Sequence, residues 1–216
     1  ECGRNPHGGQ RLSLPSYTDV ATAMETRFEQ LHQAGEKIDS ISFTGNGEPT
    51  LHPDFEQIIG KTVELRDTFF PNAQVSVFSN STNLPKERVR RALNKIDNPI
   101  LKLDTLNPEL LQLINAPAGN VTIERIMENL RLMKGEYILQ TMFLRGEYDG
   151  IKFDNSAPQY AVQWQNAVLE LRPRKVMMYS IDRETPVKEL EKVTPEQMQA
   201  VAAPLIKAGI DVQING

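Results

Sequence analysis

Apolar and polar residues recur along this chain with two periods, one typical of helices and one typical of strands. Apolar residues at helical spacing begin after Ser16, and Gly35 suits the end of that helix. The same period predicts helices after Pro53, at residues 85–96, 107–114, 123–133 and 160–171, and from Thr194 onward. A period of two predicts strands at residues 38–45, 74–78, 99–105, 137–144, 175–181 and 210–214. Residues 145–150 and 184–193 are expected to be loops.

The regular alternation of expected strands and helices calls for parallel strands joined by crossover helices. The strands are too few for the eight of a complete barrel. We therefore expect an α/β fold, a partial (β/α)6 TIM-like barrel of parallel strands, in a single domain over residues 1–216. Functional groups in such folds gather where strands end. Polar side chains follow expected strands at residues 45–48, 79–83, 104–105, 145 and 182–183.

The first expected strand runs into an open backbone segment followed by a carboxylate. Gly45, Asn46 and Gly47 leave the peptide groups accessible to a ligand, and Glu48 adds an anionic acceptor. A primary ammonium group needs only acceptors, so these residues suggest an amino-acid-like cationic ligand. The alternative is a tight turn with an exposed Glu48.

Small polar residues fill positions 79–83, directly after the second expected strand. Their hydroxyl and amide groups can bind a sugar or a carboxylate. Ser and Asn also favour turns for purely local reasons, so a simple turn is the alternative.

Lys102 and Asp104 fall on the same face of the third expected strand. Two charges on a sealed apolar face are costly, so the pair fits a polar, ligand-lined interior. A salt-bridged pair on an open surface is the alternative interpretation.

The charge balance does not favour a general nucleic-acid-binding surface. With 24 Lys and Arg against 28 Asp and Glu, the net charge is −4 and the pI is about 5.5. A local patch stays open, because the expected helix at residues 85–96 carries Lys86, Arg88, Arg90 and Arg91. A solvated helix face is the simpler interpretation of that charge run.

Apolar residues make up 39% of the chain and charged residues 24%, which is an ordinary globular composition. The sequence has no apolar run of the roughly 18–20 residues needed to span a bilayer. It also shows no secretory signal, and Cys2 as the one cysteine cannot form an intrachain disulfide. We expect a cytoplasmic protein without a membrane partner.

Residues 44–55, Thr-Gly-Asn-Gly-Glu-Pro-Thr-Leu-His-Pro-Asp-Phe, closely resemble the glycine–glycine–glutamate segment of radical S-adenosylmethionine enzymes. The nearest match is the branch related to wyosine-forming tRNA-modifying proteins. The resemblance implies an enzyme that cleaves S-adenosylmethionine reductively at a 4Fe-4S cluster to start radical chemistry, with an electron donor as partner. The relatives in this branch suggest a tRNA substrate. It also implies that Gly45, Asn46, Gly47 and Glu48 hold the methionyl amino group, that Ser79 and Asn80 contact the cofactor, and that Lys102 and Asp104 lie near its ribose.

The cluster ligands implied by the resemblance are not in this sequence. The family's cluster loop carries Cys-x-x-x-Cys-x-x-Cys, and its spacing against Gly3 and Arg4 puts the last of these cysteines before Glu1. Cys2 would then be a neighbour of the cluster loop, because a single thiol does not suffice for a cluster. We expect a cluster loop and an N-terminal strand upstream of Glu1. No residue stands out as a catalytic acid, base or nucleophile.

Two rival functions follow from the same residues. One is a degenerate barrel that binds S-adenosylmethionine or another amino-acid-like ligand without cluster chemistry. The other is an ordinary (β/α) barrel enzyme that uses Lys102 as a Schiff-base amine.

Overall fold

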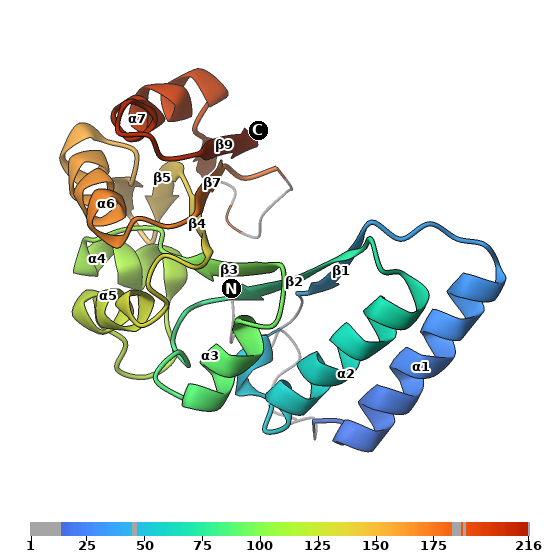
Figure 1. The fold of residues 1–216 in the computed structure, drawn as a ribbon. Coiled ribbons are helices and arrows are strands. Elements are labelled where there is room, and N and C mark those ends of the chain that lie inside the picture. The colour runs from blue at the N-terminus through green and yellow to red at the C-terminus, as the bar shows by residue number, and fades with distance from the viewer. Residues whose placement is uncertain (1–13, 45–46, 183–186, 188, 216) are drawn as a thin grey trace. The chain divides into compact units, whose positions relative to one another are not determined.

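The computed structural model describes residues 14–44, 47–182, 187 and 189–215 (Figure 1). Its helices are α1 (Tyr17–Gln33), α2 (Phe55–Phe69), α3 (Glu87–Leu93), α4 (Pro108–Leu110), α5 (Ile123–Arg131), α6 (Pro158–Leu171) and α7 (Pro195–Lys207), with a 3-10 helix η1 (Pro49–Leu51) and a π-helix η2 (Leu111–Asn115). Its strands are β1 (Ser40–Phe43), β2 (Gln74–Ser79), β3 (Asn98–Lys102), β4 (Ile138–Met142), β5 (Leu144–Tyr148), β6 (Ile151–Asp154), β7 (Lys175–Tyr179), β8 (Leu190–Lys192) and β9 (Val212–Asn215).

Six strands form one sheet in the order β1-β2-β3-β4-β7-β9. Strand β1 pairs with β2, β4 with β7, and β7 with β9, all in parallel. The predicted α/β fold is confirmed, and each expected strand of this sheet is found within a few residues of its expected bounds. The helices join successive parallel strands, as crossover connections require.

The chain forms two compact units. The N-terminal unit comprises Cys2–Ser79 and Asn83–Ile100, and the C-terminal unit comprises Asn80–Thr82 and Leu101–Gly216. The expectation of a single domain over residues 1–216 stays a prediction.

In the N-terminal unit, α1 and α2 run side by side (Figure 1). Ser16 caps the N-terminus of α1. Its hydroxyl accepts a hydrogen bond from the Asp19 N–H, and the Asp19 carboxylate accepts one from the Ser16 N–H. The core below the two helices is built on Phe28, Leu65 and Phe70, so the apolar stripe expected from the sequence is the buried face.

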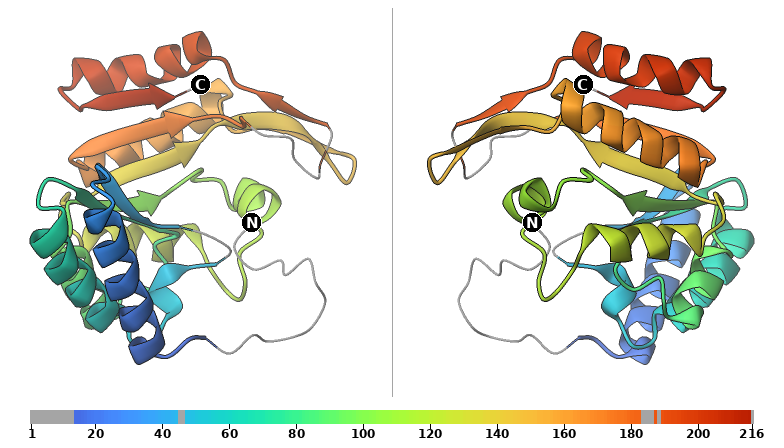
Figure 2. Two further views of the ribbon diagram at one scale, coloured as in Figure 1. Left: turned by 90° about the vertical axis from the view of Figure 1, so that its right-hand side faces the viewer. Right: turned by 90° about the vertical axis from the view of Figure 1, so that its left-hand side faces the viewer.

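In the C-terminal unit, α7 runs alongside β9, and α6 packs against α7 (Figure 2). Trp164 on α6 is 1% exposed and lies edge-to-face with Phe143, with ring centroids 5.1 Å apart. Its indole Nε1 donates a 3.0 Å hydrogen bond to Thr141 Oγ1. The polar edge of this large side chain is thus satisfied within the core.

A second sheet of three antiparallel strands, in the order β6-β5-β8, corrects the sequence prediction. Residues 145–150 and 184–193 were expected to be loops, but β5 covers most of the first segment and β8 lies in the second. Asp149 and Gly150 form the turn between β5 and β6, with φ of 51° and 76°. An Asp-Gly pair with two positive φ angles is a typical hairpin turn. The polar, charged residues before it led to the expectation of a loop.

Candidate functional site

Of the glycine–glutamate segment, Gly45 and Asn46 lie outside the described residues. Gly47 is exposed, and an added Cβ there would meet no atom within 4 Å. Glu48 is 8% exposed, so its carboxylate is buried and not the exposed side chain of a simple turn. It caps η1, where its Oε1 accepts hydrogen bonds from the Thr50 N–H at 3.1 Å and the Thr50 hydroxyl at 2.5 Å.

A short chain of buried hydrogen bonds continues from Glu48 through Thr50 to Asn83. Asn83 Nδ2 donates a 3.1 Å hydrogen bond to Thr50 Oγ1, and Thr50 is fully buried. All three residues belong to the N-terminal unit, where they connect the segment after β1 with the segment after β2. Asn83, at the end of the polar run at residues 79–83, therefore supports through Thr50 the carboxylate predicted to bind a ligand.

Ser79 and Asn80, the two residues predicted from that run, belong to different units. Ser79 is the last residue of β2 and is 6% exposed. Asn80 Oδ1 accepts hydrogen bonds from the Thr82 N–H at 3.1 Å and the Thr82 hydroxyl at 2.7 Å. This is the local turn chemistry that Asn favours, and it occupies the Oδ1 atom of Asn80.

Lys102 and Asp104 form an ion pair, with Nζ and Oδ2 3.3 Å apart. The Asp104 side chain is fully buried and that of Lys102 is 27% exposed, so the pair does not lie on an open surface. Asp104 also accepts hydrogen bonds from the Met142 N–H at 2.8 Å and from Asn115 Nδ2 at 2.5 Å. Several donors thus offset the cost of burying this carboxylate.

Asn155 is a buried neighbour of Asp104 that the sequence pattern does not reveal. Its Nδ2 donates to the carbonyl oxygens of Asp104 at 3.0 Å and Met142 at 2.8 Å, and its Oδ1 accepts from the Leu144 N–H at 2.8 Å. Asn155 is 2% exposed and fixes the segments that follow β3 and β4. No local pattern identifies it, because one of its partners, Asp104, lies 51 residues away in sequence.

The arginines of α3 are engaged in contacts within the N-terminal unit. Arg88 donates to the carbonyl oxygens of His52 and Pro53, and Arg90 to those of Leu84 and Pro85. Arg91 makes two 2.9 Å hydrogen bonds to the Glu56 carboxylate, and these bonds lower the pKa of Glu56. The basic residues of this helix hold neighbouring segments, so the charge run is not by itself a nucleic-acid contact.

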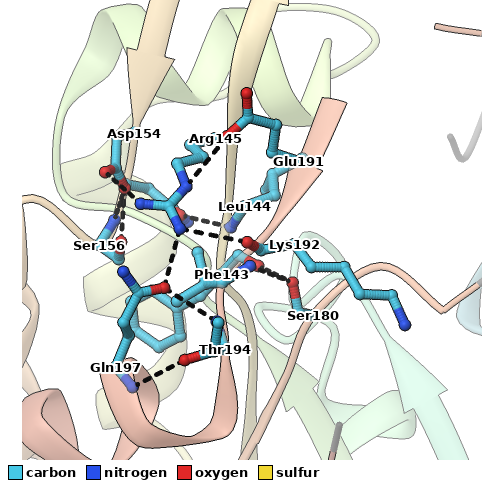
Figure 3. Close-up of polar contacts among 12 residues, drawn as sticks. Phe143, Leu144, Arg145, Asp154, Ser156, Ser180, Glu191, Lys192, Thr194 and Gln197 are labelled. Carbon is cyan, nitrogen blue, oxygen red and sulfur yellow. Dashed lines mark hydrogen bonds and ion pairs between the residues drawn. The ribbon is translucent and has the colours of Figure 1, made fainter. Parts of the chain in front are cut away.

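Arg145, another polar residue after an expected strand, lies in β5 between acidic residues of β6 and β8 (Figure 3). Its guanidinium is 3.9 Å from Asp154 and 3.5 Å from Glu191, and it donates a 2.8 Å hydrogen bond to Gln197 Oε1 of α7. These contacts tie the small sheet to the start of α7.

The described residues do not supply a cluster site. Within residues 14–44, 47–182, 187 and 189–215, no group of three or more His, Cys, Asp or Glu side chains could hold a metal ion. Cys2, the expected neighbour of the cluster loop, lies outside these ranges. Over the same ranges, no helix is both long and apolar enough to cross a membrane.

A family model described as "Radical SAM superfamily" matches residues 2–150. A UPF0026 protein of Methanocaldococcus jannaschii is 31% identical over 140 residues, which are 62% of this chain and 41% of that protein. The GTPase Obg of Brachyspira hyodysenteriae is 25% identical over 99% of this chain and 30% of its own length. The chain thus spans well under half the length of these curated relatives.

The name of the Brachyspira relative does not indicate a nucleotide site in this chain. A P-loop needs a Gly-x-x-x-x-Gly-Lys-Ser/Thr sequence in a loop between a strand and a helix. Gly60, Lys61 and Thr62 lie inside α2, and the position of the first glycine is occupied by Phe55. Lys61 Nζ pairs with Glu25 at 2.5 Å and Glu64 at 2.9 Å, contacts that hold α2 to α1.

Among solved structures, SuiB of Streptococcus suis bound to S-adenosylmethionine matches with a TM-score of 0.66 and 15% identity over 97% of this chain and 45% of that chain. A radical SAM methyltransferase from Sphaerobacter thermophilus matches with a TM-score of 0.62 and 16% identity over 96% of this chain and 59% of that chain. A domain of a pyruvate-formate lyase-activating enzyme from Bacteroides vulgatus matches with a TM-score of 0.60 and 18% identity over 82% of this chain and 99% of that domain. At these identities the likeness concerns the fold.

Proposed function

The chain belongs to the radical SAM superfamily, and from that premise we propose that it binds S-adenosylmethionine and takes part in its reductive cleavage at a 4Fe-4S cluster. The cofactors supply the radical chemistry, and the protein supplies placement and exclusion of water. The described residues hold no ligand set for the cluster, so the proposal assigns its ligands to residues outside the described ranges.

The observation that carries this proposal is the buried carboxylate of Glu48. An ammonium group at the methionyl end of the cofactor needs hydrogen-bond acceptors, and a carboxylate adds an opposite charge. The Glu48 carboxylate is held in one orientation by Thr50. Thr50 is in turn held by Asn83. A carboxylate fixed in this way loses little side-chain entropy when it binds a ligand.

The remaining predicted residues complete the proposed cofactor site. The peptide groups of Gly45, Asn46 and Gly47 would lie along the methionyl part, with Ser79 and Asn80 as further contacts. Lys102 and Asp104 would lie near the ribose. Since the Asp104 side chain is fully buried, its part in this site would be to hold Lys102 in place.

Titration calorimetry of the full-length protein with S-adenosylmethionine tests the role of Glu48. We expect Glu48→Ala and Glu48→Gln each to weaken binding at least tenfold, about 1.4 kcal/mol. The glutamine variant keeps an oxygen for the Thr50 N–H but loses the charge, so it separates cofactor binding from helix capping. Glu29→Gln, an exposed acid on α1, is the matched control. Wild-type affinity in Glu48→Gln would refute the role.

Cluster chemistry needs a separate experiment, because a barrel that only binds S-adenosylmethionine would give the same result in the calorimetric titration. The full-length protein, reconstituted anaerobically with iron and sulfide, is reduced with dithionite in the presence of S-adenosylmethionine. We expect about four iron atoms per chain and the formation of 5′-deoxyadenosine, measured by chromatography. Iron-free protein that still binds the cofactor would favour the degenerate binding domain.

The substrate class and the branch rest on the resemblance of residues 44–55 to wyosine-related proteins. On that basis we propose a tRNA substrate, with an electron donor as the second partner. A gel-shift titration of the cofactor-loaded, full-length protein with total tRNA is expected to show a complex that weakens as salt rises. No shift at low salt would remove tRNA as the substrate.

A further inference from the structure

An apolar cavity of about 530 Å³ lies in the C-terminal unit, apart from the residues assigned above to the cofactor. Its walls come from α4 and η2, from β6, and from the start of α6. The volume falls within the range of about 300–1,000 Å³ that is usual for small-molecule sites. Leu110, Leu113, Ile151, Phe153, Ala157 and Tyr160 form most of the lining.

The rim of this cavity exposes apolar surface that a folded chain ordinarily covers. Ile151 is 57% exposed although it is a large aliphatic residue, and Phe153 and Leu113 are only half-buried. Leu113 projects from a π-helix, a distortion that recurs at functional sites. A ligand that covers these side chains would gain the free energy of removing them from water.

Hydrogen bonds join the cavity to the strand ends where sites of parallel α/β folds form. Asn155 stands between two lining residues, Asp154 and Ala157, and binds the backbone of Asp104, Met142 and Leu144. Asp154 itself caps the turn before α6 by accepting hydrogen bonds from the N–H and hydroxyl of Ser156. One wall of the cavity is therefore positioned by the segments after β3 and β4.

Charges at the cavity favour a cationic or neutral occupant over an anionic one. Two carboxylates, Glu109 and Asp154, line it with a single ammonium, that of Lys152. Arg145 lies close to Asp154 but is also paired with Glu191 and bonded to Gln197. Glu109 is exposed at the rim, where its carboxylate can accept from an amine.

A neighbouring cavity of about 590 Å³, lined by Arg145, Glu147, Glu189 and Glu191 among others, does not offer the same surface. It shares Lys152, Phe153 and Asp154 with the apolar cavity, but six of the nine residues that line it are charged. Its arginine is held by the contacts drawn in Figure 3. An apolar ligand would therefore meet fewer apolar side chains there.

We propose that the cavity lined by Leu110, Ile151 and Phe153 is a binding site for an apolar amine, an aromatic or branched alkyl group that carries a protonated nitrogen. We also assign this ligand as part of the substrate of the enzyme. That assignment rests on the proposed function, whereas the binding site itself does not. The apolar body would cover Ile151 and Phe153, and the amine would face Glu109.

Three probes of similar size test the proposal: 2-phenylethylamine, 2-phenylethanol and phenylacetate. Their binding to the full-length protein without S-adenosylmethionine is measured by ligand-observed NMR titration. We expect the amine to bind best, the alcohol next, and phenylacetate at least threefold more weakly than the amine. Tighter binding of phenylacetate than of the amine would overturn the proposal.

Two variants at exposed positions locate the site without threatening the fold. Ile151→Ser is expected to weaken binding of the amine and the alcohol at least threefold. Glu109→Gln should weaken only the amine, because it removes the charge and keeps the shape. Val162→Ser, an equally exposed apolar position on α6 outside the cavity lining, is the control and should bind all three probes as the wild type does. Equal effects of Ile151→Ser and Val162→Ser would overturn the proposal.

Titration of the same variants with S-adenosylmethionine separates the two proposals. Ile151→Ser should keep wild-type affinity for the cofactor while losing the probe. If the wild-type protein binds the amine but not S-adenosylmethionine, the proposed function is refuted and the assignment of the cavity stands.

Discussion

The backbone N–H of Met142, the last residue of β4, donates a 2.8 Å hydrogen bond to Oδ1 of Asp104. The other oxygen of this carboxylate accepts from Asn115 and pairs with Lys102. A charge predicted to face a ligand is thus also a structural centre of the C-terminal unit. We therefore expect substitution of Asp104 to lower the stability of the folded protein, with any effect on function coming after that loss.

Asp104→Ala is expected to lower the free energy of unfolding by about 3 kcal/mol, because it leaves buried donors without an acceptor. Lys102→Met should cost about 1 kcal/mol, since the hydrogen bonds from Met142 and Asn115 remain. Urea unfolding curves of both variants give the comparison. Equal losses would mean that the ion pair, and not the hydrogen bonds, dominates this cluster.

Tyr137 is fully buried at the start of β4, and its hydroxyl has no hydrogen-bond partner among the residues described. Tyr137→Phe removes an unsatisfied polar group without changing the shape of the ring. We expect it to raise the free energy of unfolding by about 1 kcal/mol. Tyr160→Phe, at a half-buried ring, should change stability by less than about 0.5 kcal/mol. A destabilised Tyr137→Phe would contradict the assignment of an unpaired hydroxyl.

The same hydroxyl gives the protein a pH dependence at the alkaline end. Burial raises the pKa of Tyr137 above its ordinary value of 10.0. Above about pH 10 the unfolded chain releases this proton while the folded chain keeps it, so stability should fall as pH rises. Between pH 8 and pH 11, the urea concentration at the unfolding midpoint should fall more for the wild-type protein than for Tyr137→Phe. Parallel drops would show that other groups account for the alkaline loss.

Gly146 and Gly60 should respond in opposite directions to an added methyl group. Gly146 has φ of 149°, and a Cβ there would clash with the Glu189 carbonyl oxygen in the neighbouring chain segment. Gly146→Ala should therefore destabilise the protein by at least about 2 kcal/mol. In α2, Gly60 has open space at its Cβ position, and Gly60→Ala should stabilise by about 0.5–1 kcal/mol. Thermal unfolding measures the stability of both variants. In Gly146→Ala, hydrogen exchange should show reduced protection in β5 and β8.

Two arginines of the N-terminal unit should differ in their contribution because they differ in exposure. The Arg66 side chain is 13% exposed and donates to the Ala73 carbonyl at 3.0 Å and to Asp97 at 2.8 Å. The Arg91 side chain is 53% exposed. We expect Arg66→Met to cost about 2 kcal/mol and Arg91→Met less than about 1 kcal/mol, because solvent screens the exposed pair. The ranking would be refuted by an Arg91 variant that is the less stable of the two.

The sequence by itself determined the helices and the six strands of the parallel sheet. Apolar spacing located α1, and Ser16 and Thr194, where helices were expected to start, are the N-cap residues of α1 and α7. It also placed Glu48 within the segment that resembles the radical SAM cofactor motif. Each of these features depends on residues only a few positions apart.

The tertiary structure decided which polar groups work together. Asn83 supports Thr50 across 33 positions, and Asn155 reaches the carbonyl of Asp104 across 51. The burial of Glu48, the pairing of β8 with β5, and the apolar cavity beside Ile151 also arise from contacts between distant segments. Periodicity and caps act over one or two turns of chain, whereas burial and hydrogen-bond partners are fixed only when remote segments pack together.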